Sequence, residues 1–457
     1  MAPPTRVPLH SSDGQDLPDN TSILARWSEH FQSLFSANRT IQDAAILRIP
    51  QLPLKEELNK PPTLEETIEA IGKLKSHKAA GVDDVPPKIW KNGGPMLHDF
   101  LVCCWEQSKL PQDLRDTVII TLYKNKGEKS DCFNYWGITL LSIAGKVLAR
   151  ILLNRLVSTI AEENLPKSQC GLRANRGTTD MVFVLCQLQE KCQEQNRGLC
   201  AAFVDLTKAF DTVSRTELWL ILERPGCPTK FLQMCLQAHT KTQERLIQDL
   251  LFIDDAVLVA HTERALQRIT SCLADASRLF GLAVSLKKTE VLHQPTPQED
   301  YHPPHITICG TKLKSTQQFT YLGCIISFDA RIDKEIENRL SKANRSFGRL
   351  YKRVWHNNNL KNKTKISVYR AVVLTTLLYG SETWITYRSY IRLLERFHQR
   401  CLRTILNIHW SDFITNIEVL ERAEIPSIEA MLLKSHLRWA GHVSRMPCLA
   451  NSPSATV

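Results

Sequence analysis

Two adjacent acids, Asp254 and Asp255, stand inside the apolar run from Leu250 to Val259. A run of this length and β-branched content predicts buried strand structure, in which an unpaired carboxylate is costly. The pair could form the exposed tip of a charged hairpin. It could equally bind a hard divalent cation, because paired carboxylates at a tight turn offer the oxygen ligands that such ions prefer.

A third acid favours the metal-binding interpretation. The apolar run from Leu199 to Val204 predicts a second buried strand, and Asp205 follows it before a more helical pattern begins. An acid at the end of one strand can meet an acidic pair at the turn between two others across a sheet. Three converging carboxylates can hold two Mg²⁺ ions roughly 3.5–4 Å apart, one activating a hydroxyl and one neutralising a leaving phosphate. This is the chemistry of nucleic-acid polymerases.

Both acidic segments resemble motifs of a known family. Residues 203–213, Phe-Val-Asp-Leu-Thr-Lys-Ala-Phe-Asp-Thr-Val, resemble the first catalytic motif of reverse transcriptases from non-LTR, LINE-type retrotransposons. Residues 252–255, Phe-Ile-Asp-Asp, resemble the Phe-Ala-Asp-Asp box of the same family. The resemblance implies an α+β right-hand fold of fingers, palm and thumb, followed by a helical C-terminal region. It also implies an RNA template, a DNA primer and dNTP as partners, and two Mg²⁺ ions, with Mn²⁺ as a substitute.

The resemblance assigns roles to single residues of the palm. Asp205, Asp254 and Asp255 become the catalytic metal ligands, and Leu206 joins them as a metal-binding position. Phe210 stands at the sugar-gate position, where it would exclude ribonucleotides by occupying the space of a 2′-hydroxyl. Lys288 lies in the segment that resembles the fourth palm motif, where a lysine can protonate the departing pyrophosphate, although a surface lysine is the commoner state of this residue.

Basic residues ahead of the palm resemble the nucleotide and template contacts of the fingers. Lys124 and Lys126 follow a predicted strand over 117–123 and offer cations to phosphate. Arg173 and Arg176 lie in a segment that resembles the Gln-x-Gly-Phe-Arg motif along the template, with an ordinary surface loop as the alternative. Trp136 stands where the family has an arginine, and an indole offers one donor and no charge, which indicates a loss at the nucleotide site.

Two segments after the palm resemble primer and duplex contacts. Tyr321 and Gly323 lie in a stretch that resembles the primer-grip hairpin, where glycine permits close backbone approach. From residue 332 to 355, apolar residues trace one helical stripe while cations, including Arg339, Arg345 and Arg349, occupy the rest. A solvated helix face is one interpretation, and the excess of cations favours a thumb helix along a duplex groove.

One segment expected of the family is missing. Family members carry a Gln-Gly-x-x-x-x-Pro motif between the two aspartate motifs, whose glycine lets the backbone approach the nascent base pair. Residues 214–250 contain no Gln-Gly, while the flanking sequence still resembles the family. We interpret this as an internal deletion between about residues 237 and 242. Because a displacement of about 1 Å at such a site can cost roughly a hundredfold in rate, activity is expected to be impaired.

Hydrophobic periodicity predicts the elements that must position these residues. Helices are expected over 22–35, 143–157, 265–279 and 390–408. A further helix is expected to begin at the capping box formed by Thr63 and Glu66. The predicted domains are an N-terminal helix and linker (1–62), fingers with part of the palm (63–198), the palm (199–330), and the thumb with a C-terminal helical region (331–457). A chain of 457 residues is long enough for several subdomains.

Composition agrees with a partner that carries negative charge. The formal net charge of +11 suits a polyanion, although membrane-surface proteins share this property. The 14 cysteines include no Cys-x-x-Cys pair, so neither a zinc site nor a disulfide framework is indicated. The N-terminus lacks a hydrophobic signal core and no apolar run could span a bilayer, so an intracellular location, cytoplasmic or nuclear, is expected.

These patterns together predict an RNA-directed DNA polymerase region of a LINE-type retroelement, with activity impaired by the missing palm segment. Two alternatives stay open. The chain could be a catalytically inactive nucleic-acid-binding remnant of a retrotransposon, or a decayed reading frame without a stable product.

Overall fold

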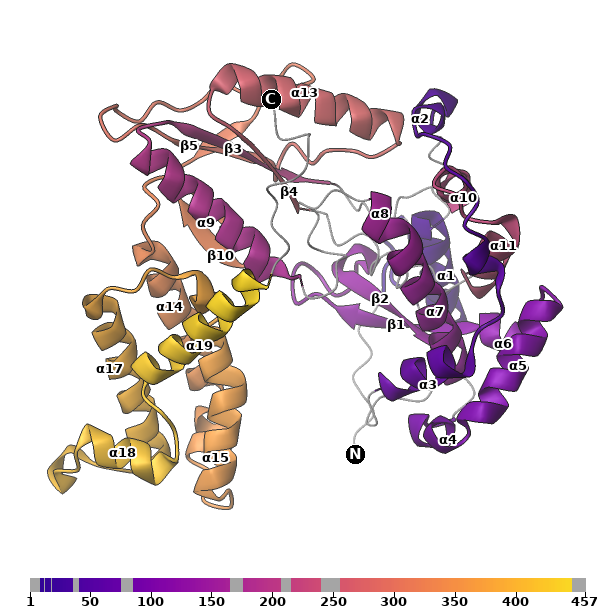
Figure 1. The fold of residues 1–457 in the computed structure, drawn as a ribbon. Coiled ribbons are helices and arrows are strands. Elements are labelled where there is room, and N and C mark those ends of the chain that lie inside the picture. The colour runs from indigo at the N-terminus through magenta and orange to yellow at the C-terminus, as the bar shows by residue number, and fades with distance from the viewer. Residues whose placement is uncertain are drawn as a thin grey trace. The chain divides into compact units, whose positions relative to one another are not determined.

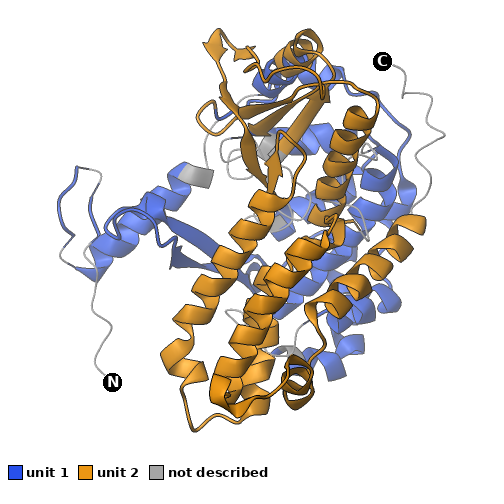
Figure 2. Cartoon of the chain, turned by 90° about the vertical axis from the view of Figure 1, so that its left-hand side faces the viewer, with its two compact units in different colours: residues 1–175, 205–254, 272–285 blue, residues 176–204, 255–271, 286–457 orange. Residues whose placement is uncertain are grey.

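The computed structural model describes residues 9–11, 13–17, 19–35, 41–74, 85–164, 176–206, 215–239 and 255–445 (Figure 1). The chain divides into two compact units, each assembled from segments that are discontinuous in sequence (Figure 2). Unit 1 comprises residues 1–175, 205–254 and 272–285, and unit 2 comprises residues 176–204, 255–271 and 286–457. Helices and strands occur in both units, in agreement with the predicted α+β class.

Unit 1 is mainly helical. Its described helices are α1 (Asn20–Phe35), α2 (Asp43–Leu47), α3 (Leu64–Gly72), α4 (Pro87–Asn92), α5 (Gly94–Glu106), α6 (Gln112–Arg115), α7 (Ile143–Leu156), α8 (Glu162–Asn164), α10 (Arg215–Glu223) and α11 (Thr229–His239). The main core is formed by apolar side chains of α3, α5, α7 and α11, among them Leu97, Leu148 and Phe231. Burial of these faces against one another supplies most of the stability of such amphipathic helices.

The beginning of α3 shows how local sequence sets an element. Thr63 accepts a hydrogen bond from the backbone N–H of Glu66 through its Oγ1, and Glu66 Oε2 accepts one from the N–H of Thr63. This reciprocal pair satisfies two donors that the first helical turn leaves open, as the sequence predicted. The same Glu66 carboxylate accepts from Arg155 of α7, with Nε–Oε1 at 2.7 Å. The cap therefore also ties α3 to α7.

A two-stranded hairpin projects from the helices of unit 1. Strand β1 (Thr117–Tyr123) pairs antiparallel with β2 (Tyr135–Leu141), with Thr117 opposite Leu141. One face of the hairpin receives α1, whose Phe31 approaches Gly137 so closely that a Cβ built at that glycine would lie 2.5 Å from the ring. Glycine at this strand position is therefore required by the packing of α1 on the hairpin.

Unit 2 contains a four-stranded sheet in the order β4-β3-β5-β8. Its strands are β3 (Leu199–Asp205), β4 (Asp255–Ala260), β5 (Glu290–Gln294) and β8 (Lys314–Thr316). Residues 199–204 are all buried, as expected of a continuous apolar strand covered on both faces. Helix α9 (Thr178–Glu194) contributes Val182 and Leu185 to the core of this sheet. Helix α13 (Glu263–Leu279) follows β4.

The rest of unit 2 consists of short hairpins and a helical region. The short strands are β6 (Thr307–Ile308), β7 (Thr311–Lys312), β9 (Gln318–Tyr321) and β10 (Cys324–Ser327). The helices are α14 (Asp333–Arg349), α15 (Asn362–Val368), α16 (Thr375–Leu377), α17 (Arg388–Leu406), α18 (Asn416–Ala423) and α19 (Ile428–Ser444). They share one core, which includes Trp355, Tyr369 and Leu402. Within the described ranges, no helix is both long enough and apolar enough to cross a bilayer.

Candidate functional site

The sheet of unit 2 brings two of the acid-bearing strand ends to the same edge. Strands β3 and β4 are hydrogen-bonded neighbours. His261, directly after β4, places its Nδ1 3.3 Å from the carbonyl oxygen of Gly198, directly before β3. The end of β4 therefore lies beside the beginning of β3, and the two strands run antiparallel. It follows that β3 ends, at Asp205, on the edge of the sheet where β4 begins, at Asp255.

The backbone around Asp205 is firmly held. The carbonyl oxygen of Asp205 accepts a hydrogen bond from the N–H of Ser285 at 2.8 Å. Leu206 forms an antiparallel bridge with Val284. These backbone pairs fix the direction in which the half-buried Asp205 side chain leaves the strand. Rigid placement of this kind is what a catalytic group needs, because its geometry must be set before the substrate arrives.

Strand β5 brings Lys288 to the same edge of the sheet. It pairs antiparallel with β3, and the residue pair nearest this edge joins Phe203 with Glu290 at the beginning of β5. Lys288 lies two residues before that strand and is exposed. The sheet order therefore brings three segments to one edge: the end of β3 with Asp205, the beginning of β4 with Asp255, and the turn before β5 with Lys288.

The metal-binding set is only partly within the described residues. Asp254 and Phe210 lie outside them, as does the side chain of Asp255. Among the groups whose placement is described, no three histidine, cysteine or acidic side chains cluster closely enough to hold a metal ion. The carboxylate donors of Asp205 and its sequence-predicted partners fit a hard cation such as Mg²⁺, which takes oxygen ligands. Their assignment as metal ligands stays a prediction.

The two predicted nucleotide-binding lysines differ in their surroundings. Lys124 Nζ donates to the carbonyl oxygen of Phe133 at 2.8 Å, so this ammonium braces the connection between β1 and β2. Lys126 is exposed in the same connection. Trp136 is 55 % exposed on β2, opposite Leu122. An exposed indole at this position provides no charge for a triphosphate.

Of the two predicted template arginines, Arg176 is within the described residues and lies two residues before α9. Arg173 falls outside the described residues. Arg176 Nη1 lies 3.5 Å from Asp180 Oδ1, and the other carboxylate oxygen of Asp180 accepts from the N–H of Gly177 at 2.7 Å. His442 Nε2 lies 3.0 Å from the same Asp180 Oδ1. Arg176 thus belongs to a structural network around a buried carboxylate.

The predicted primer-grip hairpin is a tight two-residue turn between β9 and β10. Leu322 and Gly323 have φ values of +47° and +87°, and Tyr321 pairs with Cys324. The Tyr321 side chain is 2 % exposed, with its ring 5.5 Å from that of Phe203. The tyrosine therefore belongs to the sheet core, and contact with nucleic acid at this turn would have to involve the backbone.

Residues 124–249 match the family described as reverse transcriptase (RNA-dependent DNA polymerase). The RNA-directed DNA polymerase from mobile element jockey of Drosophila funebris is 23% identical over 457 residues, covering 86% of this chain and 49% of that protein. The corresponding jockey protein of Drosophila melanogaster is 20% identical over 405 residues, covering 76% of this chain and 44% of that protein. An uncharacterized 149 kDa protein of transposon TX1 from Xenopus laevis is 30% identical over 219 residues, or 46% of this chain and 17% of that protein.

Residues 124–249 thus match a reverse transcriptase domain, and the match and these relatives fit a reverse transcriptase of the non-LTR, LINE type. The resemblance predicted from the sequence motifs is thereby confirmed. The chain spans half or less of the length of these relatives. Their activities as whole proteins therefore do not transfer directly to it.

The cationic helix predicted over residues 332–355 differs from the prediction at one position. Arg345 and Arg349 are exposed on α14, as a nucleic-acid contact requires. Arg339, in contrast, is 5 % exposed and donates from Nε to Glu335 Oε1 at 2.5 Å. Its placement on the solvated face was wrong, because Glu335 one turn earlier forms a buried ion pair with it. The spacing of four residues between an acid and an arginine is the signal that could have revealed this pair.

The buried pair supports the predicted primer-grip turn. Glu335 Oε2 accepts from the N–H of Ile325 at 2.8 Å, and Arg339 Nη2 donates to the carbonyl oxygen of Gly323. The Arg339 guanidinium also lies 4.6 Å from the ring centre of Tyr379, whose hydroxyl donates to the Leu322 carbonyl oxygen at 3.0 Å. Sequence reasoning missed Glu335 and Tyr379, which hold the turn from outside its own motif.

Proposed function

We propose that this chain is the polymerase region of a LINE-type reverse transcriptase, with RNA-templated DNA synthesis as its ancestral reaction. The 3′-hydroxyl oxygen of a primer attacks the α-phosphate of a dNTP, the new O–P bond forms, and pyrophosphate leaves. Asp205, Asp254 and Asp255 would hold the divalent metal ions through their carboxylate oxygens. Two Mg²⁺ ions, when bound there, supply the positive charge that activates the hydroxyl and neutralises the leaving group.

The observation that carries this proposal is the antiparallel pairing of β3 and β4. Asp205 ends one strand and Asp255 begins its neighbour on the same edge of the sheet. An acid from each of two adjacent strands is the arrangement that a shared cation needs, since both carboxylates leave the sheet at one end. The family match at residues 124–249 supports the same assignment.

Other residues take supporting roles in this proposal. Lys288, exposed at the same edge, donates a proton to the departing pyrophosphate. Phe210 limits the space for a ribose 2′-hydroxyl, and Leu206 adds a backbone position beside the first acid. Lys126 is available to a triphosphate, whereas Lys124 already donates to a backbone carbonyl. Arg345 and Arg349 contact the phosphates of the template–primer duplex from α14.

We also propose that turnover is impaired. The sequence lacks the Gln-Gly motif between the acidic motifs, and exposed Trp136 replaces a cation at the nucleotide site. Both losses affect the positioning of the base pair and triphosphate, and positioning contributes a large part of the barrier reduction in such a reaction. The second candidate function, a nucleic-acid-binding remnant without turnover, is favoured by the same two observations.

Primer extension on an RNA template tests both parts of the proposal. The assay compares this chain, its Asp254→Asn variant and an active LINE-type reverse transcriptase in the presence of Mg²⁺ and dNTP. We expect extension at least about a hundredfold below the active enzyme, and we expect any residual synthesis to vanish in the variant. Synthesis at the rate of the active enzyme would refute impairment. Synthesis that survives Asp254→Asn would refute the assigned carboxylates.

A further inference from the structure

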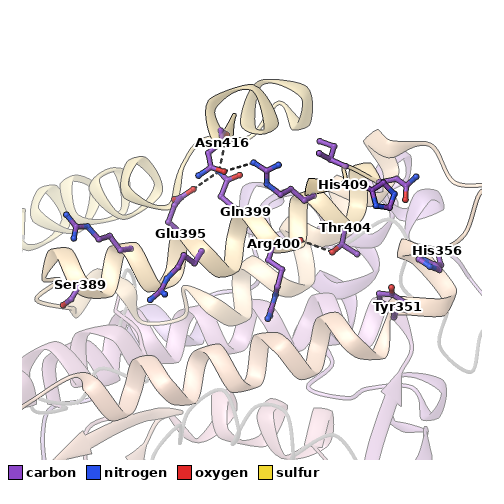
Figure 3. Close-up of a pocket in the computed structure, with 14 residues that line it drawn as sticks. Tyr351, His356, Ser389, Glu395, Gln399, Arg400, Thr404, His409 and Asn416 are labelled. Atoms are coloured by element: carbon purple, nitrogen blue, oxygen red, sulfur yellow. Dashed lines mark hydrogen bonds between the residues drawn. The ribbon is translucent and has the colours of Figure 1, made fainter. Parts of the chain in front are cut away.

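A cavity lined by cationic side chains lies in unit 2, along α17 (Figure 3). The cavity has a volume of about 1140 Å³, and four arginines line it: Arg392, Arg396, Arg400 and Arg403. Their spacing of four, four and three residues places them on one face of the helix. At 1.5 Å per residue the row extends over roughly 16 Å, which is long enough to meet several phosphates of one strand.

The first two arginines of this row have no competing partner among the described residues. Arg392 and Arg396 are exposed, and no hydrogen bond or ion pair joins either of them to that part of the chain. Arg400 Nη2 donates to the neutral Asn344 Oδ1 at 3.0 Å, and its guanidinium lies 5.3 Å from the ring centre of Phe397. Arg403 Nη2 is engaged by the Ile414 carbonyl oxygen and Asn416 Oδ1, both at 2.9 Å. Three guanidinium groups therefore keep donors and charge available to an anionic ligand.

Among the described residues that line the cavity, Glu395 is the one acidic side chain, and both of its carboxylate oxygens already accept hydrogen bonds. Glu395 Oε1 accepts from Gln399 Nε2 at 3.1 Å, and Glu395 Oε2 accepts from the N–H of Ile428 at 2.8 Å. Within the described residues, the partners of these two oxygens are neutral groups and not arginines of the row. The cavity consequently has an excess of positive charge that its own walls do not neutralise.

An aromatic surface lies at one end of the same cavity. Tyr351 and His356 line it at the end opposite Ser389, as Figure 3 shows. Their ring centres are 4.7 Å apart with 33° between the planes, and Tyr351 is 41 % exposed. An exposed ring held by a neighbouring ring offers a flat face on which a base can stack. Bases already paired and stacked in a duplex do not present such a free face.

We propose that this cavity binds a single-stranded segment of nucleic acid. Arg392, Arg396 and Arg400 contact successive phosphates, and one base stacks on Tyr351. A cationic row with an aromatic face at its end is the combination by which proteins hold single strands without reading their sequence. The inference rests on the proposed function for the class of its partner, but strand binding does not require nucleotide transfer.

The first experiment measures binding of a fluorescein-labelled 20-nucleotide single strand to the full chain by anisotropy, without Mg²⁺ or dNTP. The test variant is Arg392→Gln/Arg396→Gln. The control is Arg264→Gln/Arg268→Gln, which removes two exposed arginines with the same spacing from α13. The slope of log affinity against log salt is negative, and we expect the test variant alone to reduce its magnitude by roughly 1.4, since each lost phosphate contact on a single strand contributes about 0.7. Equal slopes in the two variants would overturn the proposal.

The second experiment tests the stacking partner and the alternative ligands. Tyr351→Ala is expected to weaken single-strand binding on the order of tenfold, and Tyr351→Phe is expected to retain it. Loss of binding in both variants, or in neither, would contradict a stacking role. A matched duplex and a 20-residue polyglutamate serve as competitors. Displacement by either at the same concentration as the unlabelled single strand would overturn the assignment to single strands. Thermal melts of each variant establish that folding is retained.

None of these outcomes depends on polymerase activity. If the chain binds single strands through this cavity but does not extend primers, this inference stands. If the chain extends primers, and the test and control variants bind single strands equally tightly, the proposed function stands and this inference is refuted. The two proposals therefore fail separately.

Discussion

The Arg339 guanidinium supports the backbone of the predicted primer-grip turn from a buried position on α14. It is buried with Glu335 and donates to the backbone of the β9–β10 turn. Buried ion pairs add little net stability, but removal of one partner leaves an uncompensated charge. A substitution of Arg339 or Glu335 alone is therefore expected to cost more stability than the substitution of both residues together.

We therefore predict that Arg339→Leu lowers the free energy of unfolding by about 3–5 kcal/mol. The double variant Glu335→Leu/Arg339→Leu should lose distinctly less, because it leaves no unpaired charge, although the N–H of Ile325 loses its acceptor. Urea denaturation followed by circular dichroism provides both values. Equal losses in the single and double variants would show that the pair does not behave as a buried, coupled unit.

At the scale of elements, the packing of α1 on the β1–β2 hairpin depends on the absence of a side chain at Gly137. A Cβ at Gly137 would lie 2.5 Å from Phe31 Cε1 and 3.2 Å from Ile119 Cγ2. Phe31 is itself buried and stacks on Trp27, with ring centres 5.7 Å apart. The helix cannot yield without disturbing this aromatic cluster, so any added volume at the glycine must be absorbed by strain.

Gly137→Ala is accordingly expected to destabilise the protein by about 1–3 kcal/mol. Gly348→Ala provides a control with the opposite sign. Gly348 lies in α14 with nothing within 4 Å of a built Cβ, so alanine there should stabilise by about 0.5–1 kcal/mol. The urea denaturation midpoints of the two variants, each compared with the unsubstituted protein, measure both effects. A neutral Gly137→Ala would mean that α1 does not pack on the hairpin in the way described.

Local patterns predicted several elements closely. The strand over residues 117–123 and the cap at Thr63 are as expected, and the helix expected over 265–279 is α13 (Glu263–Leu279). The cationic helix expected to reach Trp355 ends at Arg349, and a π-helical turn over Tyr351–Trp355 follows. Periodicity could not reveal this break, because the apolar positions of the two segments continue the same stripe.

At the scale of the whole molecule, the order of the chain does not correspond to its compact units. Each unit is built from three stretches of sequence, and one of the boundaries between the units falls between Val204 and Asp205, inside β3. Predicted boundaries at residues 62, 198 and 330 were based on linear composition and motif order, which contain no information on such interleaving. They stay predictions, as does the arrangement of fingers, palm and thumb.

The candidate site shows the same limit of sequence reasoning. The motifs identified the acids and their class of chemistry, because adjacent carboxylates in an apolar strand are costly unless a partner such as a bound cation offsets the cost. They could not show which strands are neighbours, since that depends on contacts between segments 50 residues apart. The sheet order and the proximity of His261 to Gly198 supply this information. The cavity along α17 likewise required three-dimensional structure, although its arginine spacing is visible in the sequence.

The central claim is that Asp205 and the pair Asp254–Asp255 act as one metal site. Mn²⁺ binding followed by electron paramagnetic resonance tests it in the intact chain, with Asp205→Asn, Asp255→Asn, their double variant and the exposed Asp300→Asn as control. We predict that each site variant weakens Mn²⁺ binding at least about tenfold, that the double variant loses little more than either single one, and that the control binds normally. Unchanged Mn²⁺ affinity in Asp205→Asn, or losses in the two single variants that simply add, would contradict a shared site.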